Sequence, residues 1–157
     1  MDIEIWSIGK ENDAFIEAGI AHYFKKTTPW NKVKLDTFQL PKKLVSTDVQ
    51  RTKKLEEELI LKKLQANHYL VLLDERGKML DSPQWATQFQ SCMNQGTRTL
   101  VILIGGAFGV TDCIRDKANQ VWSLSKLVFP HQLVRLMVAE QVYRAFSILN
   151  NAPYHHQ

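Results

Sequence analysis

The C-terminal third of the chain gathers the side chains best suited to acid–base chemistry. His131 follows Pro130 at the start of a predicted helix, and a short tail ends in Tyr154, His155 and His156. An imidazole exchanges a proton near neutral pH, and a tyrosine ring can stack on a nucleobase. We expect His131 and the tail to serve acid–base or base-stacking chemistry, and the plainer alternative is a solvent-exposed tail.

Two arginines in the same predicted helix are candidates for holding a phosphate or an electron-rich base. Arg135 and Arg144 interrupt a strongly apolar periodicity, and a planar guanidinium suits either ligand. Glu140 precedes Arg144 by four residues, so a simple helix-surface ion pair worth about 0.2–0.5 kcal/mol is an equal alternative. A long terminal helix also often packs against another subunit.

The segments after three predicted strands are where a parallel sheet binds ligands. The run Gly105-Gly106-Ala107-Phe108-Gly109 allows close approach to its backbone, but it lacks the spacing of a dinucleotide-binding or P-loop motif. The segment 124–129 suits a neutral heterocycle held by backbone groups. A tight turn and an edge strand are the plain alternatives. We therefore look for a site in the loops after Asp74, Ile104 and Phe129.

Alternating patterns position these segments at the ends of strands. Five strand–helix alternations predict an α/β fold, a mostly parallel sheet with helices on both faces. Thr111 is the predicted N-cap of the fourth helix, and 75–78 is a predicted turn. The predicted strands are 2–8, 33–39, 69–74, 100–104 and one within 121–129, and the predicted helices are 12–25, 48–66, 83–94, 111–119 and 131–149.

The apolar spacing of two helices predicts which faces are buried. The first helix should bury Phe15, Ile16, Ile20 and Tyr23, and the second should bury the leucines Leu55, Leu59 and Leu64. The most apolar strand, 100–104, should lie in the centre of the sheet.

Length and composition favour one domain spanning 1–157. The chain has 157 residues, 45% of them hydrophobic and 23% charged, which excludes a disordered or disulfide-rich class. No apolar run is long enough for a membrane span, and no signal peptide is evident, so we expect a cytoplasmic protein. Cys92 and Cys113 are expected to be reduced thiols packed in helices, with no metal site.

Positive charge is concentrated in one stretch of a chain whose net charge is +4. The stretch from Lys25 to Lys63 holds eleven Lys and Arg residues against five Asp and Glu. Such a basic surface suits a polyanion such as nucleic acid, although a solvated helix face is the commoner explanation.

Several motifs resemble the ribosomal RNA large subunit methyltransferase H family, whose members are small SPOUT-class enzymes. The resemblance covers the whole chain and is most specific between 129 and 146. The matching motifs are Leu72-Leu73-Asp74, Ile104-Gly105-Gly106, Trp122-Ser123-Leu124-Ser125, Phe129-Pro130-His131-Gln132-Leu133-Val134-Arg135, Glu140-Gln141-Val142-Tyr143-Arg144-Ala145-Phe146 and Pro153-Tyr154-His155.

The resemblance implies a specific reaction and fold. The family transfers a methyl group from S-adenosyl-L-methionine to N3 of pseudouridine 1915 in helix 69 of 23S rRNA, on the assembled 70S ribosome. It works as a homodimer without membrane or metal, and its α/β fold carries a C-terminal trefoil knot. The cofactor-binding residues that the resemblance implies are Leu73, Gly105, Leu124, Ser125, Lys126, Leu127, Val128 and Phe129.

The reaction that the resemblance implies needs catalytic groups, and the candidates for them are our own hypothesis. A base must take the N3 proton, and His131 and His155 are both candidates, while Arg135, Arg144 and Tyr154 are candidates for orienting the nucleobase. His156 stands where the family commonly has Lys or Arg. The alternatives are a SPOUT methyltransferase with another RNA target and a non-catalytic ribosome-binding module.

Overall fold

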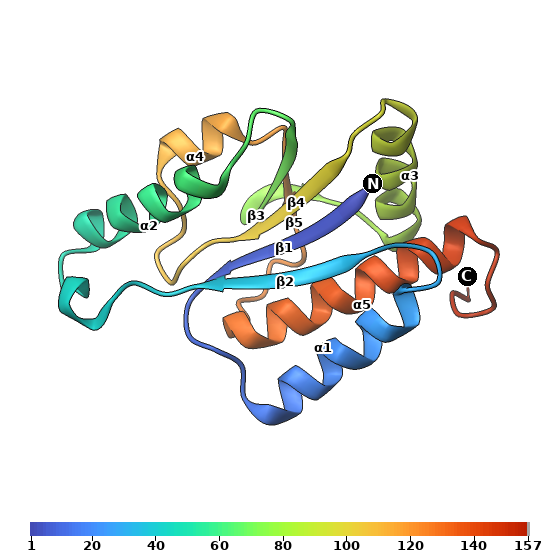
Figure 1. Ribbon diagram of the computed structural model, residues 1–157, viewed down its shortest axis with the longest axis horizontal. Helices are drawn as coiled ribbons and strands as arrows, with labels where there is room; N and C mark the ends of the chain where they lie inside the picture. Colours follow the sequence, from blue (N-terminus) through green and yellow to red (C-terminus); the bar gives the residue numbers. More distant parts are fainter. Residues whose placement is uncertain (157) are drawn as a thin grey trace.

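Five parallel strands form one sheet in the order β2-β1-β4-β3-β5 (Figure 1). A computed structural model describes residues 1–156. The strands are β1 (Asp2–Ile8), β2 (Val33–Phe38), β3 (His68–Met79), β4 (Thr99–Ile104) and β5 (Gln120–Ser123). The helices are α1 (Ala14–Thr27), the short 3₁₀ turn η1 (Lys42–Leu44), α2 (Val49–Lys63), α3 (Ser82–Asn94), α4 (Asp112–Lys117) and α5 (His131–Leu149).

The central strand is β4, as its apolar sequence predicts. Its side chains alternate between two cores: Ile102 faces the core built by α3 and α5, and Leu103 faces the core that includes Ile60 of α2 and Ile114 of α4. A strand covered on both faces needs apolar residues at every position, and every residue from 100 to 104 is buried.

Helices cover both faces of the sheet, which confirms the predicted α/β architecture. In Figure 1, α1, α3 and α5 lie on one side, and α2 and α4 lie on the other. The α5 helix packs against both α1 and α3 and begins and ends where its sequence pattern predicts. All strand pairs among the described residues are parallel, so the carboxyl ends of the strands meet at one edge.

The predicted turn at 75–78 is wrong, because β3 continues through it to Met79. The pairing of β3 with β5 shifts register between Leu73 and Lys78, so the strand absorbs the extra residues as an irregularity. Gly77 makes this possible, since a Cβ there would lie 2.6 Å from the Trp122 carbonyl carbon. At this irregularity the backbone of β3 at Gly77 lies directly against the backbone of β5 at Trp122.

Both predicted apolar faces need correction. Phe15 is 73% exposed, although Ile16 and Ile20 are buried as expected. In α2 the buried residues are Ile60 and the charged Glu57. Glu57 can be buried because its carboxylate accepts hydrogen bonds from Lys54 and Thr111. Hydrophobic spacing could not find this face, since a carboxylate occupies its centre.

The structure also bears on the predicted N-cap of α4 and on the two cysteines. Thr111 is the N-cap of α4, its hydroxyl accepting from Ile114 N, but α4 ends at Lys117. Both cysteines are free and lie in helices, yet Cys113 is exposed while Cys92 is buried. No helix within residues 1–156 is long and apolar enough to cross a membrane.

Candidate functional site

A cavity opens at the carboxyl edge of the sheet, between the middle of β3, the end of β4 and the chain that enters α5. It combines an apolar wall with backbone groups of irregular chain, and the side chains of Asp74 and Glu75 add carboxylates at its edge. The residues that line it are Leu73, Asp74, Glu75, Ile104, Gly105, Ser123, Leu124, Ser125, Leu127, Val128, Phe129, His131 and Val134.

Most of the expected cofactor residues line this cavity together. Leu73, Gly105 and five residues of the 124–129 segment do so, whereas the exposed Lys126 does not. The segment owes its irregular course to local hydrogen bonds: Ser123 Oγ donates to the Ser125 carbonyl, and Leu127 N donates to Ser125 Oγ. These bonds replace the strand pairing that the apolar sequence suggests.

Asp74 lines the cavity, although the sequence motifs did not assign it to the site. Its carboxylate accepts from Arg76 Nε at 3.1 Å and from Arg115 Nη2 at 2.5 Å, and the second contact fixes β3 to α4. Burial alone would raise its pKa, but the hydrogen bonds from Arg76 and Arg115 outweigh burial and lower the pKa to about 2. Asp74 is therefore an anion at neutral pH beside the cavity.

The glycine loop between β4 and α4 is covered by α2. A Cβ on Gly106 would lie 2.6 Å from Glu56 Oε2, so the Glu56 side chain reaches directly over this loop. Burial raises the pKa of the half-buried Glu56 carboxyl group. The loop itself is tight, because Gly109 N donates to the Gly106 carbonyl and Gly109 adopts a φ of 76°.

His131 lies in the cavity wall at the first turn of α5. Burial and the positive charge of Arg135 lower the pKa of its imidazole, while a hydrogen bond to the Gly106 backbone partly opposes them. The net effect favours the neutral ring at pH 7. A neutral imidazole retains one nitrogen that accepts a proton, which is the property that a general base requires.

Arg135 occupies a different environment from the one we expected. Its side chain is 1% exposed, and its guanidinium donates to Ser7 Oγ, the Lys10 carbonyl and Asn12 Oδ1 at 2.7–2.8 Å. These contacts attach α5 to the end of β1 and the loop after it. Nε and Nη1 of the guanidinium are both bonded within the protein, so Arg135 attaches α5 to the scaffold around His131.

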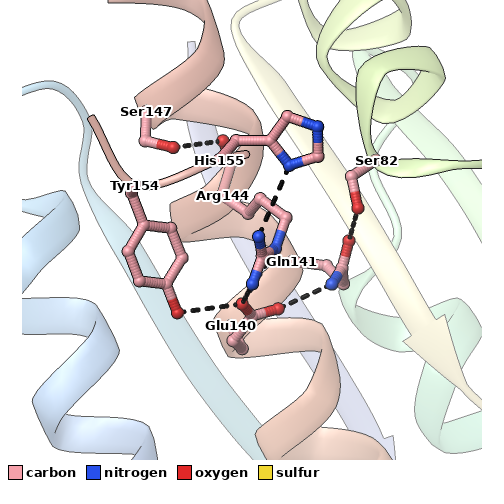
Figure 2. A network of polar contacts seen from close by, with 7 residues as sticks. All are labelled: Ser82, Glu140, Gln141, Arg144, Ser147, Tyr154 and His155. Atoms are coloured by element: carbon pink, nitrogen blue, oxygen red, sulfur yellow. Dashed lines mark hydrogen bonds and ion pairs between the residues drawn. The ribbon is translucent and has the colours of Figure 1, made fainter. Parts of the chain in front are cut away.

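The tail residues form a second cluster at the other end of α5 (Figure 2). Glu140 receives hydrogen bonds from Arg144 and from Tyr154 Oη, the latter at 3.0 Å. Arg144 also donates to His155 Nδ1 at 3.4 Å and lies 4.7 Å from the centroid of the Tyr154 ring. Arg144, Tyr154 and His155 are thus brought together as the sequence suggests, with Glu140 at their centre.

The two groups of expected catalytic residues are far apart within one chain. His131 and Arg144 are thirteen positions apart on one continuous helix, α5, which corresponds to roughly 20 Å along its axis. Within one chain, Arg144 is therefore well separated from the cavity wall at His131. Among residues 1–156, no group of three or more His, Cys, Asp or Glu is arranged to hold a metal ion.

Comparisons with known proteins find matches over the whole length of the chain. A family model described as a predicted SPOUT methyltransferase matches residues 1–155. Three similar curated proteins are each named Ribosomal RNA large subunit methyltransferase H. That of Flavobacterium johnsoniae is 41% identical over 157 residues and covers 100% of both chains. That of Cytophaga hutchinsonii is 40% identical, covering 99% of this chain and 100% of the relative, and that of Halothermothrix orenii is 34% identical, covering 99% of each.

One solved structure supports the fold. A probable methylase family protein from Haemophilus influenzae Rd KW20 superposes with a TM-score of 0.52 at 16% identity, covering 95% of this chain and 66% of that one. The family match and the curated relatives both extend over essentially the whole chain. The chain therefore belongs to the SPOUT methyltransferase family, with the ribosomal RNA large subunit methyltransferases H among its relatives.

Proposed function

We propose that this chain, a single SPOUT domain, transfers a methyl group from S-adenosyl-L-methionine to N3 of a pseudouridine in helix 69 of 23S rRNA, within the assembled ribosome. The observation that carries the proposal is the cavity itself. Seven of the eight residues that the family resemblance implies for cofactor binding line one cavity at the carboxyl edge of the sheet, although they come from three separate segments.

The lining suits S-adenosyl-L-methionine. Leu73, Leu124 and Phe129 supply apolar surface for the adenine, and the irregular backbone of the segment that contains Ser125 lines the same cavity. Asp74 adds a carboxylate at the edge of the cavity, where Arg76 and Arg115 hold it. When bound, this cofactor supplies an electrophilic methyl group, so the protein needs only to orient the acceptor nitrogen and take its proton.

His131 is the residue in the cavity that best fits removal of the N3 proton. N3 of pseudouridine is an imide nitrogen between two carbonyls, and it becomes a nucleophile when its proton leaves. The pKa of His131 is lowered by burial and by Arg135, so the ring is neutral and accepts a proton at pH 7. The proton moves from N3 to the free imidazole nitrogen as the methyl group reaches N3.

The tail cluster implies that two copies of the chain build the site. Arg144 lies roughly 20 Å from His131 along α5, and Tyr154 and His155 contact the side chains of Glu140 and Arg144, so a second copy of the chain is the proposed source of the tail at the cavity. Exposed apolar side chains near the cavity fit such a contact, because Val128 is 87% and Leu127 is 71% exposed and both line the cavity. We therefore propose a homodimer.

The basic stretch is the proposed contact with rRNA. Lys42 and Lys43 are exposed on η1, whereas Lys54 and Lys63 are engaged with Glu57 and with Asp36. Exposed lysines neutralise phosphates without reading sequence, which suits a small enzyme that recognises a folded ribosome. The family resemblance also implies that the chain from β5 into α5 threads a trefoil knot, and we include this in the proposal.

A methyl-transfer assay tests the proposed function. The purified protein is incubated with methyl-labelled S-adenosyl-L-methionine and with 70S ribosomes, separated subunits or free rRNA, and the label is mapped by nuclease digestion and mass spectrometry. The proposal predicts label at N3 of a helix 69 pseudouridine with 70S ribosomes. Label at another RNA position would indicate a different target, and no label together with no cofactor binding by calorimetry would favour a non-catalytic ribosome-binding module.

A further inference from the structure

Glu140 is the centre of the tail cluster, and the proposed reaction leaves it without a role. One oxygen accepts from Arg144 Nε at 2.9 Å, from Arg144 Nη2, and from Tyr154 Oη at 3.0 Å. The other oxygen accepts from Gln141 Nε2 at 2.6 Å, and Gln141 Oε1 in turn accepts from Ser82 at 2.7 Å. Figure 2 shows this carboxylate joining α5 to the tail and to the start of α3.

The orientation of Arg144 decides which nitrogen of His155 carries a proton. A guanidinium has donors only, so the 3.4 Å contact between Arg144 Nη1 and His155 Nδ1 requires that Nδ1 accept. In a neutral imidazole the proton then lies on Nε2. Glu140 holds the other two guanidinium nitrogens and so fixes the direction in which Nη1 points.

We propose that Glu140 is a positioning residue, whose carboxylate aims Arg144 at His155 Nδ1 so that the tail offers His155 Nε2–H as a hydrogen-bond donor. This inference rests on the proposed function. It divides the roles of the two histidines that the sequence leaves open: His131 takes the N3 proton, and His155 donates to a carbonyl of the imide as negative charge develops there.

The surroundings of Tyr154 agree with a tail that donates protons and does not accept them. Burial, hydrogen bonding with Tyr23 and hydrogen bonding with Glu140 all raise the pKa of Tyr154, so its phenol keeps its proton. Lys26 from α1, 5.6 Å from the ring centroid, and Arg144 from α5 are the cations that face it. Its hydroxyl is committed to Glu140, which leaves His155 as the donor free to reach a substrate.

Nitrogen-15 NMR of the imidazoles tests the positioning role without relying on activity. The His155 signals are assigned from their loss in the His155→Gln variant, and the protein is compared with Glu140→Gln. Asp116→Asn is the charge-matched control, since Asp116 is exposed and lies on α4, away from the tail cluster. We expect the native protein and the control to show one tautomer with the proton on Nε2, and Glu140→Gln to show a mixture of tautomers.

Kinetics and a tyrosine titration complete the test. We expect Glu140→Gln to lower kcat roughly 10- to 100-fold, as a misaligned donor does, with cofactor affinity within about twofold of native. The Tyr154 phenol, identified by its absence from the titration of Tyr154→Phe, should ionise at lower pH in Glu140→Gln. An unchanged His155 tautomer, or an unchanged kcat with a changed tautomer, would overturn the inference. Absence of methyl transfer by the native protein would instead contradict the proposed function.

Discussion

Replacing Arg135 by Met removes a buried cation that has no anionic partner within hydrogen-bond distance among the described residues. The side chain is 1% exposed, and its three acceptors are a serine hydroxyl, a backbone carbonyl and an asparagine carbonyl. Methionine has a similar length and fills the same space, so the substitution removes hydrogen bonds without opening a large cavity. Ser7, itself completely buried, loses its partner.

The expected cost follows from those hydrogen bonds. A hydrogen bond from a charged donor contributes about 1.5–3 kcal/mol, and an orphaned buried acceptor costs about 1–3 kcal/mol. The burial cost of the charge is relieved at the same time, which offsets part of the loss. We expect Arg135→Met to lower the free energy of unfolding by about 3–4 kcal/mol, equivalent to a fall in Tm of roughly 6–16 °C for a chain of this size.

Urea denaturation followed by tryptophan fluorescence measures this loss. Arg98→Met is the matched control, because Arg98 is exposed and should change the free energy of unfolding by less than about 0.5 kcal/mol. A loss below about 1 kcal/mol in Arg135→Met would refute the structural role. Arg135 would then again be a candidate for direct contact with a substrate.

Four further predictions concern other parts of the molecule. Asp74→Asn should cost about 1–2 kcal/mol at pH 7; because the folded pKa of about 2 lies below the unfolded one, the difference from native should disappear as pH falls from about 4 to 2, measured by thermal unfolding. Gly77→Ala should cost about 1–3 kcal/mol in urea denaturation, since its Cβ meets the Trp122 backbone at 2.6 Å, and a neutral effect would contradict that close approach. Reversing the charge of Lys42 and Lys43 should weaken ribosome binding and lower its salt slope by about 0.7–0.9 for each phosphate that the protein no longer neutralises, and unchanged affinity would exclude η1 from the interface. His131→Ala should reduce methyl transfer about 10²-fold or more while cofactor binding, measured by calorimetry, persists.

The layers of the fold could be predicted because long, regular apolar patterns specify them. The continuous apolar run of β4 identified the central strand, and the periodicity of α5 indicated both of its ends. The same reasoning from apolar patterns fails where local polar interactions determine which residues are buried. Glu57 occupies an inward position of α2 because Lys54 and Thr111 satisfy its carboxylate, and no hydrophobic pattern detects such a position.

The candidate site was only partly predictable, for a related reason. The strand ends and the family resemblance located the cavity, but residue type alone could not separate a scaffold arginine from one that contacts a substrate. Arg135 and Arg144 lie in the same helix, yet Arg135 points into the protein toward Ser7 while Arg144 joins the tail. Sequence spacing shows which face a residue occupies, and only the folded chain shows which acceptors lie there. The role of Glu140 at the centre of the cluster likewise depends on a tail that returns to α5.

Complementation between two inactive variants tests the central claim, that the cavity of one copy and the tail of another form one methyl-transfer site. Ser125→Trp fills the cavity from a position outside the proposed dimer contact, and His155→Ala removes the tail donor. The two chains are co-expressed with different tags and only mixed dimers are purified. Each variant alone should be inactive on ribosomes, and mixed dimers should recover about half of the native activity, because one of two sites is intact. Mixed dimers as inactive as the parents would show that the site lies within a single copy and would contradict the shared site.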